Sequence, residues 1–337
     1  MDLQTLWFIL IGVLFAGFFL LEGFDYGVGI LLPFLGKTDT ERRVIVNTIG
    51  PVWDGNEVWL LTAGGAMFAA FPHWYATLFS GFYLALFVIL IALIGRGVAF
   101  EFRSKDDHPR WRAVWDFALF FGSAVPALLW GVAVGNMVRG VAIDANMHYV
   151  GTFGDLLNGY ALVGGLVTLL LFTLHGALFL ELKTDGVIRE RAKGVVRRLW
   201  LPVALVIVVF VVLSAAETDM FAAWNAGKVI GLVLAVGGLA LTIVAVLRQR
   251  YGAAFVGTAL TIVGTVALAF GTLFPRVLPS TLNSAYDLTI YTASSSDYTL
   301  QVMTVIALTL VPVVLLYQGW TYWVFRKRLT TDSNLVY

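Results

Sequence analysis

Cysteine is absent from the 337 residues, and histidine occurs only four times. Without thiols the chain has no disulfides, no thiolate metal sites and no cysteine-held iron–sulfur clusters. Charged residues are also scarce, at 13% against 59% hydrophobic residues, and the formal net charge is +1. This composition excludes a soluble domain with a polar surface, and no basic stripe indicates a nucleic-acid partner.

What the chain has instead is long apolar blocks, with a mean hydropathy of +0.86. Their lengths are near the roughly 20 residues that a helix needs to cross a bilayer, and they lack the short alternating pattern of a barrel. The sequence therefore predicts an all-α polytopic membrane protein, a single membrane domain over residues 1–337 with nine transmembrane helices. The expected spans are 6–35, 49–71, 78–100, 114–138, 156–180, 199–216, 229–247, 254–275 and 300–324.

The basic residues are divided unequally between the two ends of these helices. Nineteen of the 22 fall in the odd-numbered connections and the C-terminal tail: Lys37, Arg42, Arg43, Arg96, Arg103, Lys105, Arg110, Arg112, Lys183, Arg189, Arg191, Lys193, Arg197, Arg198, Arg248, Arg250, Arg326, Lys327 and Arg328. The even-numbered connections hold Arg139, Lys228 and Arg276. Because short cytoplasmic loops carry the excess of Lys and Arg, we expect the N-terminus outside and the C-terminus in the cytoplasm.

Four carboxylates lie within the first two predicted helices. Glu22 and Asp25 are in the first, Asp54 and Glu57 in the second, and each pair is spaced i, i+3. Residues at this spacing share one helix face. An ionisable group inside a bilayer costs roughly 2.5–3.5 kcal/mol on insertion scales, so each is a candidate for function.

The two helices are antiparallel and joined by a short loop, which puts the four acids at a similar depth in the cytoplasmic half. With Asn56 and the indoles of Trp53 and Trp59 they could relay protons or hold a cation, sharing protons to reduce the cost of burial. An alternative is that the first helix ends near Leu21, so that the acids lie among headgroups. The following apolar stretch would then run along the interface.

Three further residues receive simpler interpretations. Arg96, at the end of the third helix, is expected to be a snorkelling anchor, with a counter-charge to the acids as the alternative. His175 is expected to be a hydrogen-bonded structural histidine rather than a haem ligand, and Met303 a packing residue. We identify no catalytic residue and no complete metal site.

Several motifs nevertheless resemble one family, subunit II of cytochrome bd quinol oxidase. They are EGFDYGVG at 22–29, TERR at 40–43, NTIGPVWDGNEVW at 47–59, TAGGA at 62–66, FAAFP at 68–72 and FEFRSK at 100–105, with further matches at 274–275, 279–281 and 283. The first hundred residues carry the strongest likeness, and the middle of the chain matches by helix layout.

The resemblance implies two four-helix bundles, over residues 6–138 and 156–275, and a peripheral ninth helix at 300–324. It also implies a bacterial plasma-membrane complex in which quinol oxidation reduces oxygen to water. A homologous-looking subunit I then carries haems b558, b595 and d, so this chain alone is not the catalyst. In some family members this subunit holds a structural quinone. The presence of a small single-helix subunit stays open, and no cofactor-binding residue is assigned here.

In the motifs of this family, Asp54 and Asp25 are the best candidates for a cytoplasmic proton-uptake route, with Glu57 and Glu22 behind them. Two alternatives stay open. A stand-alone proton- or cation-coupled secondary transporter would use midplane carboxylates, but an inverted repeat should then place a second acidic motif in the later helices. A purely structural subunit would use the acids for assembly.

Overall fold

The apolar blocks form the long helices of an all-helical protein. The computed structural model describes residues 1–333, 335 and 336. Within them lie eleven α-helices: α1 (Leu3–Leu35), α2 (Asp39–Ile49), α3 (Trp53–Ala70), α4 (Pro72–Gly81), α5 (Tyr83–Phe102), α6 (Pro109–Arg139), α7 (Gly159–Lys183), α8 (Gly186–Glu217), α9 (Ala226–Leu247), α10 (Tyr251–Leu273) and α11 (Asp297–Val324). A small antiparallel hairpin pairs β1 (Arg276–Leu278) with β2 (Leu288–Thr289).

Eight of the described helices are long and apolar enough to cross a membrane, all except α2, α3 and α4. The all-α membrane class is thus confirmed, but the second predicted span, 49–71, does not form one apolar helix. Its first residue closes α2, and a turn at residues 50–52 separates α2 from α3, since Pro51 has no backbone N–H with which to continue a helix. The 18 residues of α3 begin with polar turns that contain Asp54, Asn56 and Glu57.

Two other boundaries differ from the expected ones. The helix expected from Leu78 is divided by a turn at Phe82 into α4 and α5. The sixth begins at Gly186 rather than Leu199, because the Asp185 side chain caps it and the Arg- and Lys-rich segment that follows consists of good helix formers. The basic residues expected in a loop, from Arg189 to Arg198, therefore project from helical turns.

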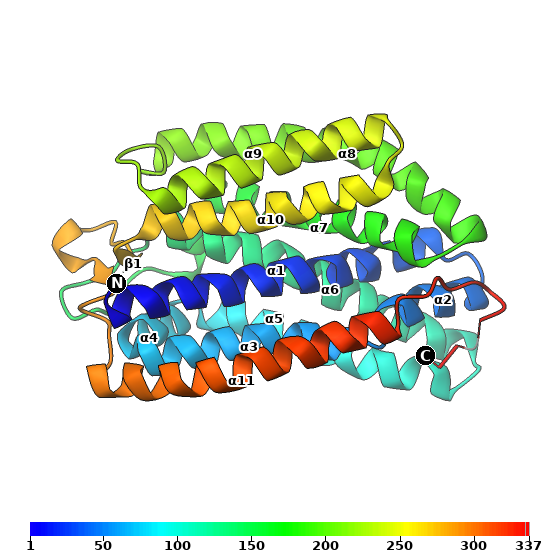
Figure 1. Cartoon of the computed structure of the whole chain (residues 1–337), viewed down its shortest axis with the longest axis horizontal. Coiled ribbons are helices and arrows are strands. Elements are labelled where there is room, and N and C mark those ends of the chain that lie inside the picture. The colour runs from blue at the N-terminus through cyan, green and yellow to red at the C-terminus, as the bar shows by residue number, and fades with distance from the viewer. Residues whose placement is uncertain (334, 337) are drawn as a thin grey trace.

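The long helices run along one axis, and the two chain termini lie at opposite ends of it (Figure 1). Helix α1 is central, packed against α3, α6, α7 and α10. Helices α9 and α10 form a tight pair on one side, and α11 lies along α3 on the opposite edge (Figure 1). The β1–β2 hairpin lies at the end that holds the N-terminus, and α2 at the end that holds the C-terminus (Figure 1).

Helices α1 and α7 touch backbone to backbone at Gly27 and Gly176. A Cβ atom on Gly27 would lie 2.0 Å from the carbonyl oxygen of Phe172 and 2.8 Å from the Cα of Gly176. Small residues of this kind let two membrane helices approach closely. The position of Glu22 and Asp25 relative to the rest of the bundle depends on this contact, because both acids lie on the same helix within two turns of Gly27.

We expect Gly27→Val to lower the melting temperature of the detergent-solubilised protein markedly. Overpacking typically costs about 1–3 kcal/mol, and the obstacle here is backbone, which cannot rotate away as a side chain can. Gly237→Val in α9 is the matched control, because a Cβ there meets nothing within 4 Å. Equal melting temperatures for the two variants would contradict the close-contact interpretation.

Ion pairs hold the end of the molecule that contains the C-terminus. The Arg103 guanidinium bonds Asp116 at 2.6 Å and Asp39 at 2.9 Å, and Arg42 bonds the same Asp116 at 2.7 Å. Across the bundle, Arg191 of α8 donates to Glu41 of α2 at 2.6 Å, and this hydrogen bond lowers the pKa of the Glu41 carboxyl. The short helix α2 is thereby tied to both halves of the chain.

Candidate functional site

The centre of the site is a pair of carboxylates on α1. Glu22 and Asp25 are fully buried, with 0% of either side chain exposed. The helix continues past them to Leu35, so the alternative that it ends near Leu21 is wrong. Glu22 Oε2 and Asp25 Oδ1 accept no hydrogen bond from any described residue. Two acidic groups are thus held one helical turn apart inside protein.

Arg96 of α5 provides the positive charge for this pair. Its side chain is 0% exposed, it bonds Glu22 directly, and its Nη1 lies 3.8 Å from Glu57 Oε2. The guanidinium also lies over the ring of Tyr26, 5.0 Å from the centroid. The interpretation of Arg96 as a snorkelling anchor is wrong, because α5 runs on to Phe102 and leaves Arg96 inside the bundle.

Asn56 of α3 links Asp25 of α1 to α11. Its amide Nδ2 donates to Asp25 Oδ2 at 2.6 Å, and its Oδ1 accepts from the Tyr322 hydroxyl at 2.7 Å and from Gln318 Nε2 at 3.2 Å. The Trp59 indole in turn donates to Gln318 Oε1 at 2.9 Å. Sequence reasoning missed Gln318 and Tyr322, although a polar pair at i, i+4 in an otherwise apolar helix is a readable signal.

The other residues singled out from the sequence lie at the border of the cluster that Glu22, Asp25, Arg96 and Asn56 form. Trp53 stacks on Phe100, with ring centroids 4.6 Å apart, and reaches toward Arg96. Glu57 faces Arg96 with its side chain 21% exposed. Asp54 is exposed on the outward face of α3, because it lies two residues from the inward-facing Asn56. The structure therefore brings together Glu22, Asp25, Asn56, Glu57 and Arg96, while Asp54 stays outside.

His175 of α7 is held by packing and by one hydrogen bond. His175 is fully buried, its Nδ1 lies 2.7 Å from Thr258 Oγ1, and its ring stacks on Phe255 with centroids 4.4 Å apart. These contacts hold the ring within packed helices, as in a hydrogen-bonded core histidine. No group of three His, Asp or Glu side chains in the described part of the chain is arranged to hold a metal ion.

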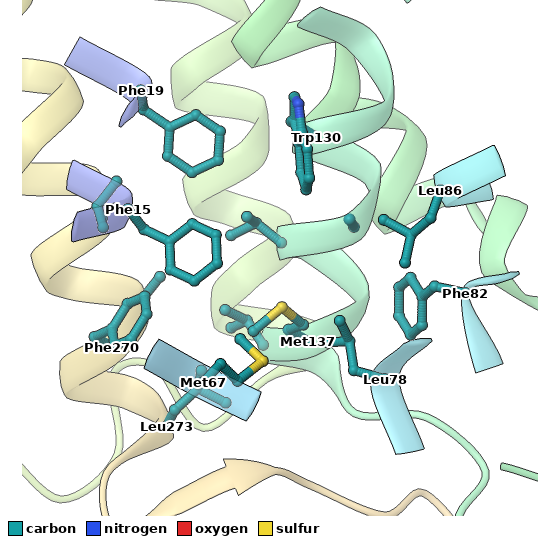
Figure 2. A pocket seen from close by; sticks show the side chains of 15 residues that line it. Phe15, Phe19, Met67, Leu78, Phe82, Leu86, Trp130, Met137, Phe270 and Leu273 are labelled. Carbon is teal, nitrogen blue, oxygen red and sulfur yellow. The ribbon is translucent and has the colours of Figure 1, made fainter. Parts of the chain in front are cut away.

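An apolar cavity of about 50 Å³ lies on the N-terminal side of the acids. Figure 2 shows Phe15 and Phe19 of α1, Trp130 and Met137 of α6 and Met67 of α3 around it. Small-molecule pockets usually measure about 300–1,000 Å³, so this cavity is too small for a quinone. No residue of the acidic cluster lines it.

Comparison with known proteins identifies the family. Residues 3–325 match the family described as Cytochrome bd terminal oxidase subunit II. The chain is 47% identical over 336 residues to cytochrome bd ubiquinol oxidase subunit 2 of Bacillus subtilis (strain 168), covering 100% of this chain and 99% of the relative. It is 38% identical over 372 residues to cytochrome bd-I ubiquinol oxidase subunit 2 of Escherichia coli (strain K12), covering 98% and 96%.

A solved structure has the same fold. A chain of the bd oxidase from Geobacillus thermodenitrificans aligns with a TM-score of 0.78 at 16% identity, covering 97% of this chain and 100% of that one. The eight apolar spans and the bacterial relatives together indicate a multi-pass bacterial membrane protein. The chain thus belongs to the cytochrome bd terminal oxidase subunit II family, whose members are subunits of an oxidoreductase complex.

Proposed function

We propose that this chain is the non-haem subunit of a quinol oxidase and conducts protons from the cytoplasm toward the oxygen-reducing haem of its partner. The observation that carries the proposal is the buried cluster of Glu22, Asp25 and Arg96. It extends through the partly exposed Glu57 to the outward face of α3. A stand-alone transporter is not favoured, because the relatives are oxidase subunits.

The orientation in the membrane is part of the proposal. The termini lie at opposite ends of the bundle (Figure 1), which requires an odd number of crossings, whereas eight helices qualify by length and composition. Helix α3 supplies the ninth, because its 18 residues extend about 27 Å at 1.5 Å per residue. The end that holds α2 and the C-terminus carries most of the basic residues, so we assign it to the cytoplasm and the N-terminus to the outside.

Asp54 supports a route that leaves this chain through α3. An ionised side chain facing lipid is costly at about 2.5–3.5 kcal/mol, and Asp54 is exposed on the surface of this chain. A partner subunit that covers this face of α3 would remove Asp54 from lipid. It would also place Asp54 and Glu57 between the buried acids and the chemistry of the partner.

The buried pair has the chemistry of a proton carrier. Two carboxylates one turn apart favour a state in which they share a proton, since like charges at short distance resist simultaneous ionisation. Arg96 offsets one negative charge and has two buried N–H groups, at Nε and Nη2, with no partner among the described residues. Unpaired buried polar groups of this kind bind water, and water carries protons between side chains.

We assign the haems to the partner subunit, because His175 stacks on Phe255 and bonds Thr258, an arrangement that does not fit a haem ligand.

The division into bundles 6–138 and 156–275 with a peripheral helix at 300–324 stays a prediction. Helix α1 packs against α7 and α10 as well as α3 and α6, so the two bundles share an extensive contact.

Asp54→Asn in the purified complex is expected to slow quinol-driven oxygen consumption several-fold and to leave the three haem spectra unchanged. Asparagine has nearly the shape of aspartate but carries no proton. Glu190→Gln is the matched control, because Glu190 is exposed, 68% of its side chain, and bonds only Lys193 among the described residues. Unchanged turnover in Asp54→Asn would remove Asp54 from the route. Loss of haem along with activity would favour a purely structural role in assembly.

A further inference from the structure

Helix α11 is scarcely packed, yet it reaches the centre of the site. Of its residues, all of which the structure describes, only Leu300 is buried. Most of its side chains are apolar and exposed, for example Leu308 at 74% and Leu316 at 77%. Its polar side chains Gln318 and Tyr322 lie one turn apart and both bond Asn56. A helix with this little packing is not needed to fill a core, so its polar contacts need another explanation.

The donors and acceptors of these contacts allow only one arrangement. An indole N–H can only donate, so Trp59 must face the carbonyl oxygen of Gln318 at 2.9 Å. The Gln318 NH₂ group then points to Asn56, whose oxygen accepts from it and from the Tyr322 hydroxyl. The Asn56 NH₂ group is thereby the part of the amide that faces Asp25, at 2.6 Å.

We propose that Gln318 and Tyr322 are positioning residues for proton transfer, and that they fix the Asn56 amide so that it donates to the Asp25 carboxylate. This inference rests on the proposed function. Without the two donors on its oxygen, the amide could rotate and offer its carbonyl to Asp25, which would suit the protonated acid and not the carboxylate. The last helix of the chain would thus set the hydrogen bonding of an acid near its beginning.

Other contacts hold α11 in place, so removing these hydroxyl and amide groups need not displace it. The Trp7 indole donates to the Leu300 carbonyl at 3.1 Å and to Thr304 Oγ1 at 3.0 Å near the start of the helix. Beyond its end, the backbone N–H of Leu329 donates to the Lys183 carbonyl at 2.8 Å, and that of Asp185 donates to the Leu329 carbonyl at 3.1 Å.

The test uses Tyr322→Phe and Gln318→Met in the purified complex. Each removes one donor to Asn56 and keeps most of the side-chain volume. Infrared difference spectra record the C=O stretch of Asp25, identified by its loss in Asp25→Asn. We expect each variant to shift this band and to lower the kcat of oxygen consumption several-fold, with unchanged KM for quinol and unchanged haem spectra. Tyr317→Phe, on the outer face of α11 at 66% exposure, should change none of these.

The outcomes separate the inference from the function it rests on. If Asp25→Asn stops turnover while both donor variants leave the band and kcat unchanged, the positioning role is overturned and the proposed function stands. If both donor variants lose haem, the contacts serve assembly and the positioning role is also overturned. If Asp25→Asn turns over normally, the proposed function itself fails.

Discussion

Arg96→Met should lower the free energy of unfolding by about 3–5 kcal/mol, the usual cost of removing one member of a buried ion pair. Arg96 and Glu22 are both 0% exposed, so the variant leaves an uncompensated carboxylate inside the protein, close to Asp25 and Glu57. The measurement is the melting temperature and haem content of the purified complex. The control is Arg198→Met, because Arg198 is exposed at the end of the bundle.

A double variant distinguishes charge balance from proton transfer. Arg96→Met combined with Glu22→Gln removes both charges, and replacing a whole buried pair by neutral groups is often neutral for stability. We expect haem content and melting temperature to recover while oxygen consumption stays low, because Glu22 can no longer hold a proton. If the double variant were as unstable as Arg96→Met alone, the pairing of Arg96 with Glu22 would not be the source of the instability.

Asp25→Asn should reduce quinol-driven oxygen consumption by at least roughly tenfold, since a positioned proton-transfer group typically contributes about 10²–10⁴-fold to a rate. The amide fits the same space but cannot carry a proton. Asp25→Glu is the conservative partner of this variant and should retain part of the activity. Stopped-flow reduction of the haems by quinol should stay near normal in Asp25→Asn, because the block falls on proton delivery to oxygen.

Asp25→Asn with full turnover and intact haems would exclude Asp25 from the proton route. Membership of the family would not be affected by that result. A complex that fails to bind haem would indicate that the acid acts in assembly. The haem content and turnover of Asp54→Asn would then decide between assembly and proton transfer, because Asp54 lies on the outward face of α3 and this variant is expected to keep its haems.

Most of the fold could be predicted from the sequence, and the errors have local causes. Apolar length predicted eight of the helices within a few residues at most ends. The helix of the second predicted span begins later than expected, at Trp53, because Pro51 separates α2 from α3. Helix α8 is longer than its apolar part because charged helix formers extend it toward Asp185. Hydropathy records which residues tolerate lipid, and not where a helix of mixed polarity begins.

The acidic site was predicted in part. The i, i+3 spacing correctly indicated that Glu22 and Asp25 share a face, since this follows from helix geometry alone. The same rule paired Asp54 with Glu57, but only packing decided that Asn56, between them, faces the bundle. For Arg96 the preferred interpretation, an anchor, was wrong, and the alternative, a counter-charge to the acids, is what the structure has. A sequence shows an arginine near a helix end and not the carboxylate opposite it.

The sequence by itself determined that this chain is a membrane protein and that most of its basic residues lie at one end of its helices. It also determined that four acids lie in the first two predicted transmembrane helices. These properties can be read from the sequence because each side chain has its own free energy of transfer into lipid, and these free energies add over neighbouring residues. Only the tertiary structure decided that Arg96 neutralises Glu22, and that Tyr322 reaches Asn56 across 266 positions of sequence. Hydrogen bonds and ion pairs depend on distances of about 3 Å, and those are set by how the helices pack.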